Sequence, residues 1–455
     1  MKDKKSWRLL IVSAFLFFLA GCMEPVELSK IGVVAGLGID KYQGNYLVTL
    51  QIMNPAGITG ENPNALPVYS VHAMGETLLT ATNALSNMST QVLFYSHLKA
   101  VVINEDIVRE EGLDDIIDFL MRNPEIRPDV TLLIAKDTTA KDVLNVITAV
   151  EQVPMNKLDA LTNINRRRTG MVSSFNLYEV MNRLHTPGST VALNMVSIRS
   201  EEEHLPHQQE DEHEADHLKQ VKEGEKKIAK SQLEEPGDSK EEVADATENE
   251  GSVENEKPST PGNEGPTKQN MEEITPPSDI KIENIAVFKG SKMIGDLNSM
   301  EAQMYNLLLG QHKRYWGRVD LNGGEYFAVM QITSIEATTQ AFIQEKKASI
   351  ELSVRGELLE GNYPMNVDNQ HNLRELEKKF EEDIQTKAMA FLKRTQEEFK
   401  TDVSDIGISA YFSNHKEWEK VSTEWDDIYP TLNIDVKCHV DVYSTGEIKN
   451  NHNLR

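Results

Sequence analysis

The sequence predicts an α+β protein with three mixed sheet-and-helix domains, which follow a lipoprotein signal peptide and are interrupted by a long disordered acidic insertion. Strand-like and helix-like segments alternate along the chain, the N-terminus has the pattern of an export signal, and residues 201–275 lack aromatic residues entirely. With 455 residues, 39% of them hydrophobic, the chain is long enough for two or three domains with apolar cores.

The first residues of the chain have the composition of a secretory signal. Three lysines and one arginine within the first eight residues precede an apolar run of twelve residues, Leu9 to Ala20, and this order is typical of signal peptides. Twelve residues are too few for a membrane-spanning helix, which needs roughly 20. We therefore expect residues 1–21 to be a signal peptide that is removed.

Cys22 is the predicted site of lipid attachment. It ends the sequence Leu-Ala-Gly-Cys at 19–22, which looks like a bacterial lipobox. In such a site the thiol carries a diacylglyceryl group as a thioether, and the new N-terminus is acylated after cleavage. Two or three acyl chains anchor a protein stably, because each buried methylene contributes about 0.8 kcal/mol. The alternative is an ordinary signal peptide beside a free cysteine, but the order of basic, apolar and small residues favours the lipoprotein.

The predicted N-terminal domain, residues 22–186, alternates strands with helices. Two apolar runs, 31–40 and 45–54, are joined at Tyr42-Gln43-Gly44 and predict a β-hairpin. Apolar residues then recur either at helical spacing or in short strand-like runs. In chain order we expect a helix carrying Leu78, Ala81, Leu85 and Met88, a strand over 97–104, a helix over 112–123, a strand over 129–136, and helices over 139–151, 156–168 and 174–184, the last stopping before Pro187.

The predicted middle domain, residues 187–330, contains the acidic insertion. Strand-like runs flank the insertion on both sides, so we place it between two strands of one small domain. A helix should follow, because an Asn three residues before a Glu is a capping-box pattern. In chain order we expect a strand over 189–198, the insertion 201–275, a hairpin over 282–297 that turns at Gly290, and a helix from Asn298 and Glu301 to Leu309.

The insertion accounts for most of the acidity of the chain. Residues 201–275 contain 23 acidic residues and 8 lysines, a net charge of −15 out of −25 for the whole chain. A segment without aromatic residues and rich in Pro, Gly, Ser, Glu and Lys cannot bury enough apolar surface to offset the entropy lost on folding. We expect a solvated, disordered insertion, with an acidic interaction segment as the alternative. The remainder is only mildly acidic, and no nucleic-acid partner is predicted.

The insertion also contains the sequence HEADH at 213–217, which matches the H-E-x-x-H signature of zinc metalloproteases. That chemistry needs both histidines on one face of a packed helix, a third protein ligand and a cleft. The flanking residues offer no apolar face on which a helix could pack. We interpret the motif as non-catalytic, with at most weak metal binding together with His204 and His207, and we predict no metal or cofactor site.

The predicted C-terminal domain, residues 331–450, combines long strands with one long helix. Alternating patterns at 326–343 and 348–359 predict strands. Residues 371–400 carry an apolar stripe at three- and four-residue spacing, which predicts a helix about 45 Å long. We expect this helix to lie across a sheet that the strand 431–443 closes. A coiled-coil helix is the alternative, but the stripe is too short for four heptads.

Neither a cysteine nor a serine–histidine pair predicts catalysis. Cys438 lies on the apolar face of the alternating strand 431–443, where a buried thiol is inert. Ser96 and His97 are adjacent on a predicted strand, so their side chains would point to opposite faces. Because Cys22 would be lipidated, no disulfide is expected either. We therefore predict that the protein is not an enzyme.

Two further motifs have structural interpretations. Gly36 and Gly38 lack a third glycine at position 41 and a following helix, so they do not form a dinucleotide-binding fingerprint. Arg166, Arg167 and Arg168 end a predicted helix. They would either contact anionic lipid headgroups or complement the helix dipole.

Several segments resemble the Ger(x)C family, the lipoprotein C subunits of spore germinant receptors. The resemblance rests on the lipobox cysteine followed by IGVVAGLGIDKYQGNYLVTLQIMNP, then on FYSHLKAVVINEDIVREEGLDDIIDFLMRNPEIRPDVTLLIAK, and later on IAVFKGSKMIGDL. It extends through nearly all of the chain outside the insertion. The chain departs from the family pattern at Met23, where Trp often follows the cysteine, and in its long acidic insertion.

The resemblance implies three mixed domains of sheet and helix with no known catalytic centre. It also implies a location on the outer face of the inner spore membrane, through membrane lipid on acylated Cys22, beside the polytopic A and B subunits of the receptor. Direct nutrient binding by this chain is not expected. The alternative is a lipid-anchored solute-binding protein of a transporter, which usually has two repeated α/β lobes and an aromatic or charged cleft. The aromatic content of 6% and the single long C-terminal helix favour the receptor subunit.

The lipid prediction is testable by replacing Cys22 with Ala. The wild-type protein should incorporate a palmitate analogue during metabolic labelling, and the Ala variant should not, because it lacks the thiol that carries the diacylglyceryl group. Membrane retention alone does not decide the matter, since an uncleaved signal also holds a protein at the membrane. Label on the Ala variant would show that the lipid is attached elsewhere.

Overall fold

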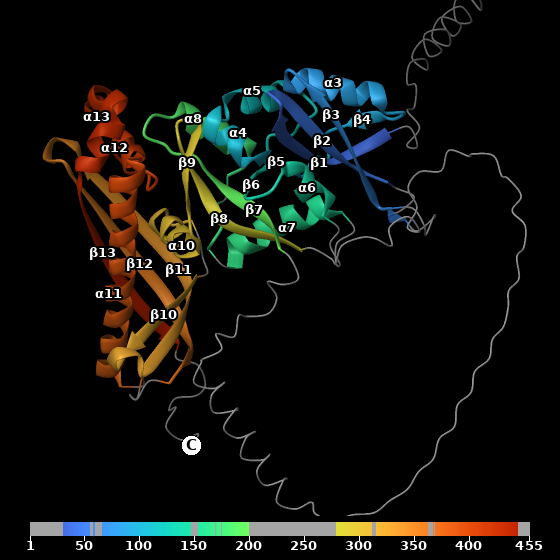
Figure 1. Ribbon diagram of the computed structural model, residues 1–455. Helices are drawn as coiled ribbons and strands as arrows, with labels where there is room; N and C mark the ends of the chain where they lie inside the picture. The colour runs from blue at the N-terminus through green and yellow to red at the C-terminus, as the bar shows by residue number, and fades with distance from the viewer. Residues whose placement is uncertain are drawn as a thin grey trace, which may run out of the picture.

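The computed structural model describes residues 31–54, 58–59, 66–146, 153–168, 170–173, 175–199, 279–311, 315–362, 367 and 369–444. The signal peptide, Cys22, the insertion 201–275 and its HEADH motif lie outside these residues. Figure 1 shows a sheet with helices on both faces, which we call the N-terminal unit (31–311), and an elongated sheet with one long helix, the C-terminal unit (315–444). The predicted α+β class is confirmed.

The N-terminal unit is built on nine described strands in the order β3-β2-β1-β5-β6-β7-β8-β9, with β4 also paired to β1. Strands β1, β5, β6 and β7 are parallel to one another, and antiparallel pairs flank them on both sides. Parallel neighbours require crossover connections, which the helices of this unit supply. The strands are β1 Ile31–Tyr42, β2 Asn45–Met53, β3 Val68–Gly75, β4 Val92–Phe94, β5 Ala100–Asn104, β6 Thr131–Ala135, β7 Ala192–Arg199, β8 Asp279–Lys289 and β9 Lys292–Leu297.

The hairpin predicted between β1 and β2 is confirmed. Tyr42 pairs with Asn45, so Gln43 and Gly44 form a two-residue turn. Both have positive φ, 52° and 82°, and two-residue hairpins favour this geometry because it matches the twist of the strands.

Helices cover both faces of this sheet (Figure 1). On β5, Val101 and Ile103 belong to the core that includes residues of α3, α4, α5 and α8, whereas Ala100 and Val102 belong to the core with residues of α6 and α7. This division follows from the two-residue period of a strand. The helices are α3 Leu78–Met88, α4 Glu105–Glu110, α5 Asp114–Arg122, α6 Ala140–Asn145, α7 Pro154–Arg168, α8 Leu177–His185 and α10 Ser299–Leu308.

Two details of the predicted helices are wrong. Met88 was expected on the buried face of its helix but is 71% exposed, because α3 ends there, beyond the residues that pack on the sheet. The helix expected from residue 174 begins at Leu177, because Asn176 and Glu179 form a capping box that fixes its first turn.

Strands β7 and β8 flank the insertion and pair with each other, as predicted. Their antiparallel register runs from Ala192 opposite Val287 to Arg199 opposite Asp279. The chain therefore leaves the sheet at the end of β7 and returns beside the same strand. After the β8–β9 hairpin, whose turn includes Gly290, the predicted capping box at the start of α10 is also present.

The C-terminal unit is a four-stranded sheet in the order β10-β11-β12-β13. Strands β10, β11 and β12 are antiparallel, whereas β12 and β13 are parallel because the chain crosses between them through α11 and the short helices that follow. The elements are β10 Tyr315–Leu321, β11 Tyr326–Phe342, β12 Lys347–Gly361, α11 Gln370–Arg394, a π-helical turn Thr395–Phe399, α12 Ile406–Ser413, α13 His415–Val421, α14 Trp425–Ile428 and β13 Asn433–Ser444.

The long helix packs on the sheet as predicted, and it does not form a coiled coil within the described residues. Its apolar stripe, including Leu376, Phe380, Ile384 and Phe391, is buried in the core shared with β13. Figure 1 shows α11 running along this sheet. The α-helical part ends at Arg394 and continues as the π-helical turn.

The three-domain division into 22–186, 187–330 and 331–450 stays a prediction. Hydrogen bonds cross both of its internal boundaries, since β6 pairs with β7 and β10 pairs with β11. Within the described residues, the strands are organised as two sheets.

Deleting residues 205–272 should leave a folded protein with one cooperative thermal transition. Because β7 and β8 are already neighbours, residues 200–204 and 273–278 suffice to connect them. Each halving of a flexible loop lowers its closure cost by about 0.6 kcal/mol, so about three halvings should raise the free energy of unfolding by no more than roughly 2 kcal/mol. Calorimetry of the deletion variant beside the wild type measures this; a marked loss of stability or cooperativity would show that the insertion contributes to the fold.

Candidate functional site

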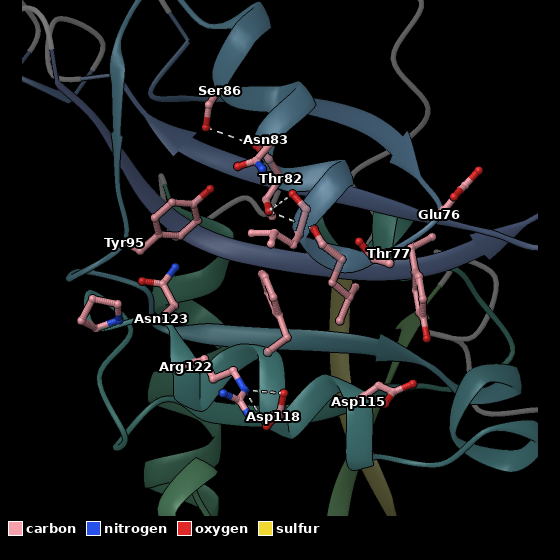
Figure 2. Close-up of a pocket in the computed structure, with 15 residues that line it drawn as sticks. Glu76, Thr77, Thr82, Asn83, Ser86, Tyr95, Asp115, Asp118, Arg122 and Asn123 are labelled. Carbon is pink, nitrogen blue, oxygen red and sulfur yellow. Dashed lines mark hydrogen bonds and ion pairs between the residues drawn. The ribbon is translucent and has the colours of Figure 1, made fainter.

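A groove between α3 and α5 is a candidate site in the described residues. It lies on one face of the N-terminal sheet and has a volume of about 690 Å³. Figure 2 shows α3 along one side of this α3–α5 groove and α5 along the other. Four separate segments line it: β2, α3 with the two residues before it, the residue after β4, and α5 with the residues that follow it.

Part of the groove lining is apolar. Leu79 of α3 lines it and is 59% exposed, and Phe119 of α5 lines it and is only partly buried. Tyr46 also lines the groove, and its hydroxyl donates a hydrogen bond to Glu111 at 3.2 Å. A ligand could therefore remove apolar surface of both helices from water, which is the main source of affinity in such sites.

Polar groups line the groove along its length, and Thr82 and Asp118 lie between its two ends (Figure 2). In Figure 2, Glu76 and Asp115 lie at one end, whereas Tyr95 and Asn123 lie at the other. Asp118 accepts hydrogen bonds from the Nε of Arg122 at 2.7 and 2.8 Å. This hydrogen bond is the main reason that the pKa of Asp118 is lowered.

A second cluster of polar groups lies where the two units meet, and we call it the unit junction. Asp402 is buried at its centre. Its Oδ2 accepts hydrogen bonds from the backbone N–H of Gly407 at 2.6 Å and from the indole N–H of Trp425 at 3.1 Å. The unit junction consists of Arg183, Gly188, Thr190, Asp402, Asp405, Gly407, Trp418 and Trp425.

Burial raises the pKa of Asp402 to about 6, and the hydrogen bonds from Gly407 and Trp425 act in the opposite direction. The charge of Asp405 raises it further. The carboxyl group is therefore ionised at neutral pH in spite of its burial, because the surrounding N–H groups stabilise its charge.

Arg183 of α8 connects the N-terminal unit to the C-terminal unit. Its two terminal nitrogens donate hydrogen bonds to Asp405 at 2.9 and 2.7 Å, and its guanidinium lies 4.1 Å from the centre of the Phe175 ring. A second link runs from the Thr190 hydroxyl to the backbone carbonyl of Asp402 at 2.7 Å. Paired hydrogen bonds of this kind fix orientation as well as distance.

Gly188 allows the two units to approach closely. It has a φ of 75°, and a Cβ added there would lie 2.5 Å from the Trp418 ring and 3.1 Å from the Cα of Gly407. Only a glycine meets both requirements, the backbone conformation and the contact. The junction is thus specified by backbone geometry as well as by hydrogen bonds.

Within the described residues, the candidates from the sequence analysis lie neither in the α3–α5 groove nor in the unit junction. Ser96 and His97 lie in the turn between β4 and β5 rather than on a strand, and His97 is exposed. The expectation that they share a strand is therefore wrong. Arg166 to Arg168 end α7 as expected, but their side chains lie outside what the structure describes.

Cys438 is buried in β13, as its place in the alternating pattern predicts. Burial, together with the nearby Glu381 carboxylate, raises the pKa of its thiol to about 12. Such a thiol is protonated at neutral pH and is a poor nucleophile.

Gly36 and Gly38 have a packing role in β1. A side chain at Gly36 would overlap Met155 of α7, and a Cβ at Gly38 would lie 3.3 Å from the backbone and the Cβ of Ala140 in α6. The two glycines therefore let α6 and α7 pack closely against the sheet. Asp40 of the same strand accepts hydrogen bonds from the first N–H groups of α6, those of Ala140 and Lys141, both at 2.8 Å.

The lining of the α3–α5 groove was not predicted from the sequence. Its residues come from segments that no motif links, so only the fold brings them together. Leu79 follows Leu78 directly and lies off the buried stripe of its helix, but one exposed leucine is ordinary on a protein surface and gave no usable signal.

Among the described residues, no group of three or more His, Cys, Asp or Glu side chains is arranged to hold a metal ion. Across the same residues, no helix combines the length and apolar character needed to cross a bilayer.

Two family models match the chain. One is described as the spore germination protein N-terminal domain and matches residues 24–198; the other is described as "Spore germination B3/ GerAC like, C-terminal" and matches residues 283–446. The first match therefore ends within β7 and the second begins within β8. Together they include the strands of both sheets and leave out the acidic insertion.

The chain is also similar to individual spore germination proteins. It is 24% identical to spore germination protein KC of Bacillus subtilis over 443 residues, which are 95% of this chain and 94% of that protein. It is 21% identical to spore germination protein GerQC of Bacillus cereus over 448 residues, which are 97% and 99% of the two. The crystal structure of the GerBC protein covers 90% of this chain, and the chain covers 97% of it, at 15% identity and a TM-score of 0.46.

Replacing Asp402 with Asn should lower the free energy of unfolding by about 3 kcal/mol at pH 7, because an NH₂ group would replace an oxygen that accepts two buried hydrogen bonds. Chemical denaturation measures the change. Asp426→Asn is the matched control, since Asp426 lies beside the unit junction, is half exposed, and forms only a 3.4 Å ion pair with Lys289. That variant should lose less than about 1 kcal/mol. Equal losses in the two variants would show that the buried hydrogen bonds of Asp402 contribute little.

The wild type and the Asp402→Asn variant should also differ in how the free energy of unfolding depends on pH. The pKa of Asp402 in the folded protein is about 6, above its ordinary value of 3.8, so the folded state binds this proton more tightly than the unfolded chain. The contribution of Asp402 to stability should therefore fall as the pH rises from about 4 to about 6 and then stay constant. Subtracting the unfolding free energies of the Asn variant from those of the wild type isolates this component; a difference that rises over this range would contradict it.

Proposed function

Because the chain belongs to the GerAC-like family of spore germination proteins, we propose that it is the lipid-anchored C subunit of a nutrient germinant receptor and is required for receptor assembly and function in spore germination. The observation that carries the proposal is the pair of family matches, which together include both units. Two of its relatives that align over nearly the whole chain are named spore germination proteins.

Membrane attachment would occur through acylated Cys22, on the outer face of the inner spore membrane. Strand β1 begins at Ile31, nine residues after Cys22, and an extended chain spans at most about 3.5 Å per residue. The start of the N-terminal sheet would therefore lie within roughly 30 Å of the lipid. An anchor this close confines the protein to the membrane surface and raises its effective concentration for integral partners.

The polytopic A and B subunits of the receptor would be those partners. Because attachment to the membrane supplies part of the binding energy, contact areas of modest size between the folded units and these subunits would suffice. Direct nutrient binding is not part of this role, and the proposal includes no catalytic step.

A lipid-anchored solute-binding protein of a transporter is the alternative. The arrangement of the sheets argues against it, since a solute binder usually closes two similar lobes around its ligand. Here one unit has a mixed sheet with helices on both faces, whereas the other has four strands and the long helix α11. The two units are thus unlike each other, and buried hydrogen bonds of the unit junction hold them together.

The proposal predicts the behaviour of spores that carry a deletion of this protein, Cys22→Ala, or the wild type. The deletion should abolish the response to at least one single nutrient, and Cys22→Ala should reduce that response and co-purification with the polytopic subunits. Cys438→Ala is the matched control, because it removes the buried cysteine and keeps the lipid site; it should behave like the wild type. If the deletion strain germinates normally with every nutrient but loses uptake of one solute, the transporter alternative is correct.

A further inference from the structure

The α3–α5 groove has the features of a ligand site that the proposed receptor role does not use. We propose that it binds a small elongated amine, with an ammonium group at one end, an apolar body, and a hydrogen-bonding group at the other end. The groove volume of about 690 Å³ lies within the range of roughly 300–1,000 Å³ that is typical of small-molecule sites.

Tyr95 marks the hydrogen-bonding end. Its side chain is 8% exposed and lines the groove, and among the described residues none forms a hydrogen bond with its hydroxyl. Figure 2 shows this hydroxyl directed across the groove towards α3, on the side of Asn83. This oxygen is not one of the buried polar atoms that lack a partner, so it is open to the groove, and a ligand there would form a hydrogen bond with it in place of water.

Carboxylates mark the other end. Glu76 and Asp115 are exposed and have no counter-ion among the described residues, whereas Arg122, the cation of the groove lining, is paired with Asp118. The N-termini of α3 and α5 lie at this end and contribute about half a positive charge each. Two full negative charges exceed that contribution, so this end of the groove favours a cation.

The apolar part of the lining and the length of the groove set the size of the ligand. Leu79 and Phe119 line the groove from opposite helices. Asp115 and Arg122 are seven residues apart on α5, which corresponds to about 10 Å along a helix. An amine with one aromatic ring or a short alkyl chain has a suitable length, and its apolar body would cover the exposed leucine.

A free small molecule matches these features better than a lysine of a partner protein does. A lysine side chain offers an ammonium group, but its other end is joined to the backbone and carries no group of its own for the Tyr95 hydroxyl. To contact both the carboxylates and the Tyr95 hydroxyl, a ligand needs a polar group at each end of an apolar body.

Tyramine is the probe that tests this proposal, because it has an ammonium group and a hydroxyl at opposite ends of an aromatic body. Isothermal titration of the purified full-length chain should give a dissociation constant at least about tenfold lower for tyramine than for phenethylamine, which lacks the hydroxyl, a difference that one hydrogen bond supplies. Tyrosol, in which a hydroxyl replaces the ammonium group, should also bind at least about tenfold more weakly.

Variants connect each preference to its residue. Tyr95→Phe should abolish the difference between tyramine and phenethylamine, and Glu76→Gln combined with Asp115→Asn should abolish the difference between tyramine and tyrosol. Asp129→Asn is the control, since this exposed carboxylate pairs with Arg127 and lies outside the groove. It should leave all three dissociation constants unchanged. Melting curves of each variant establish that the protein is folded.

The proposal is overturned if tyramine binds no more tightly than its two analogues, or if the variants at residues 76, 95 and 115 bind all three probes as the wild type does. It is also overturned if the free amines do not bind while a lysine-bearing helical peptide does, since the groove would then receive a protein segment. None of these titrations depends on germination. A failed amine site therefore leaves the proposed receptor role intact, and failure of the receptor role leaves the amine site intact.

Discussion

The pairing of β7 with β8 is the constraint on which the rest of the structure depends. These strands lie on either side of a 79-residue gap in the described chain, from 200 to 278, and they pair from Ala192–Val287 to Arg199–Asp279. Their pairing extends the N-terminal sheet through β9 and places α10 beside it. The loop contributes only a slowly growing entropic cost, so a long insertion at this point is compatible with a stable sheet.

The second half of the chain is attached to this sheet by polar groups that the sheet positions. Glu301 closes the capping box of α10 and also accepts a hydrogen bond from Arg394 of α11. At the unit junction, Arg183 and Asp405 form a mostly buried ion pair. Any other arrangement of the two units would separate the partners of these ion pairs and leave a mostly buried charge unpaired, which is costly. The ion pairs therefore fix the relative position of the units, although their net contribution to stability is small. The α3–α5 groove lies outside this junction and is free to have a role of its own.

Most helices, strands and turns predicted from the spacing of apolar residues and from short turn or capping motifs were confirmed. The hairpins at Gln43-Gly44 and Gly290, the capping box at Asn298 and the alternating strand around Cys438 depend on residues that are neighbours in the sequence. The expectations that were wrong concern places where a local pattern ends. Met88 continues the apolar spacing of α3 past the edge of its packing surface, and Ser96 and His97 follow a strand-like run but lie in a turn.

The sequence by itself determined the α+β class, the order of most strands and helices, the family and the predicted lipid site at Cys22, because each depends on composition, spacing or a short motif. Only the tertiary structure decided that β7 continues the parallel sheet, that Asp402 is surrounded by N–H donors, and that Tyr95 and Asp115 line one groove. The physical reason is that these features join segments distant in the chain. Their geometry depends on how the sheets and helices pack, and local periodicity carries no information about that packing.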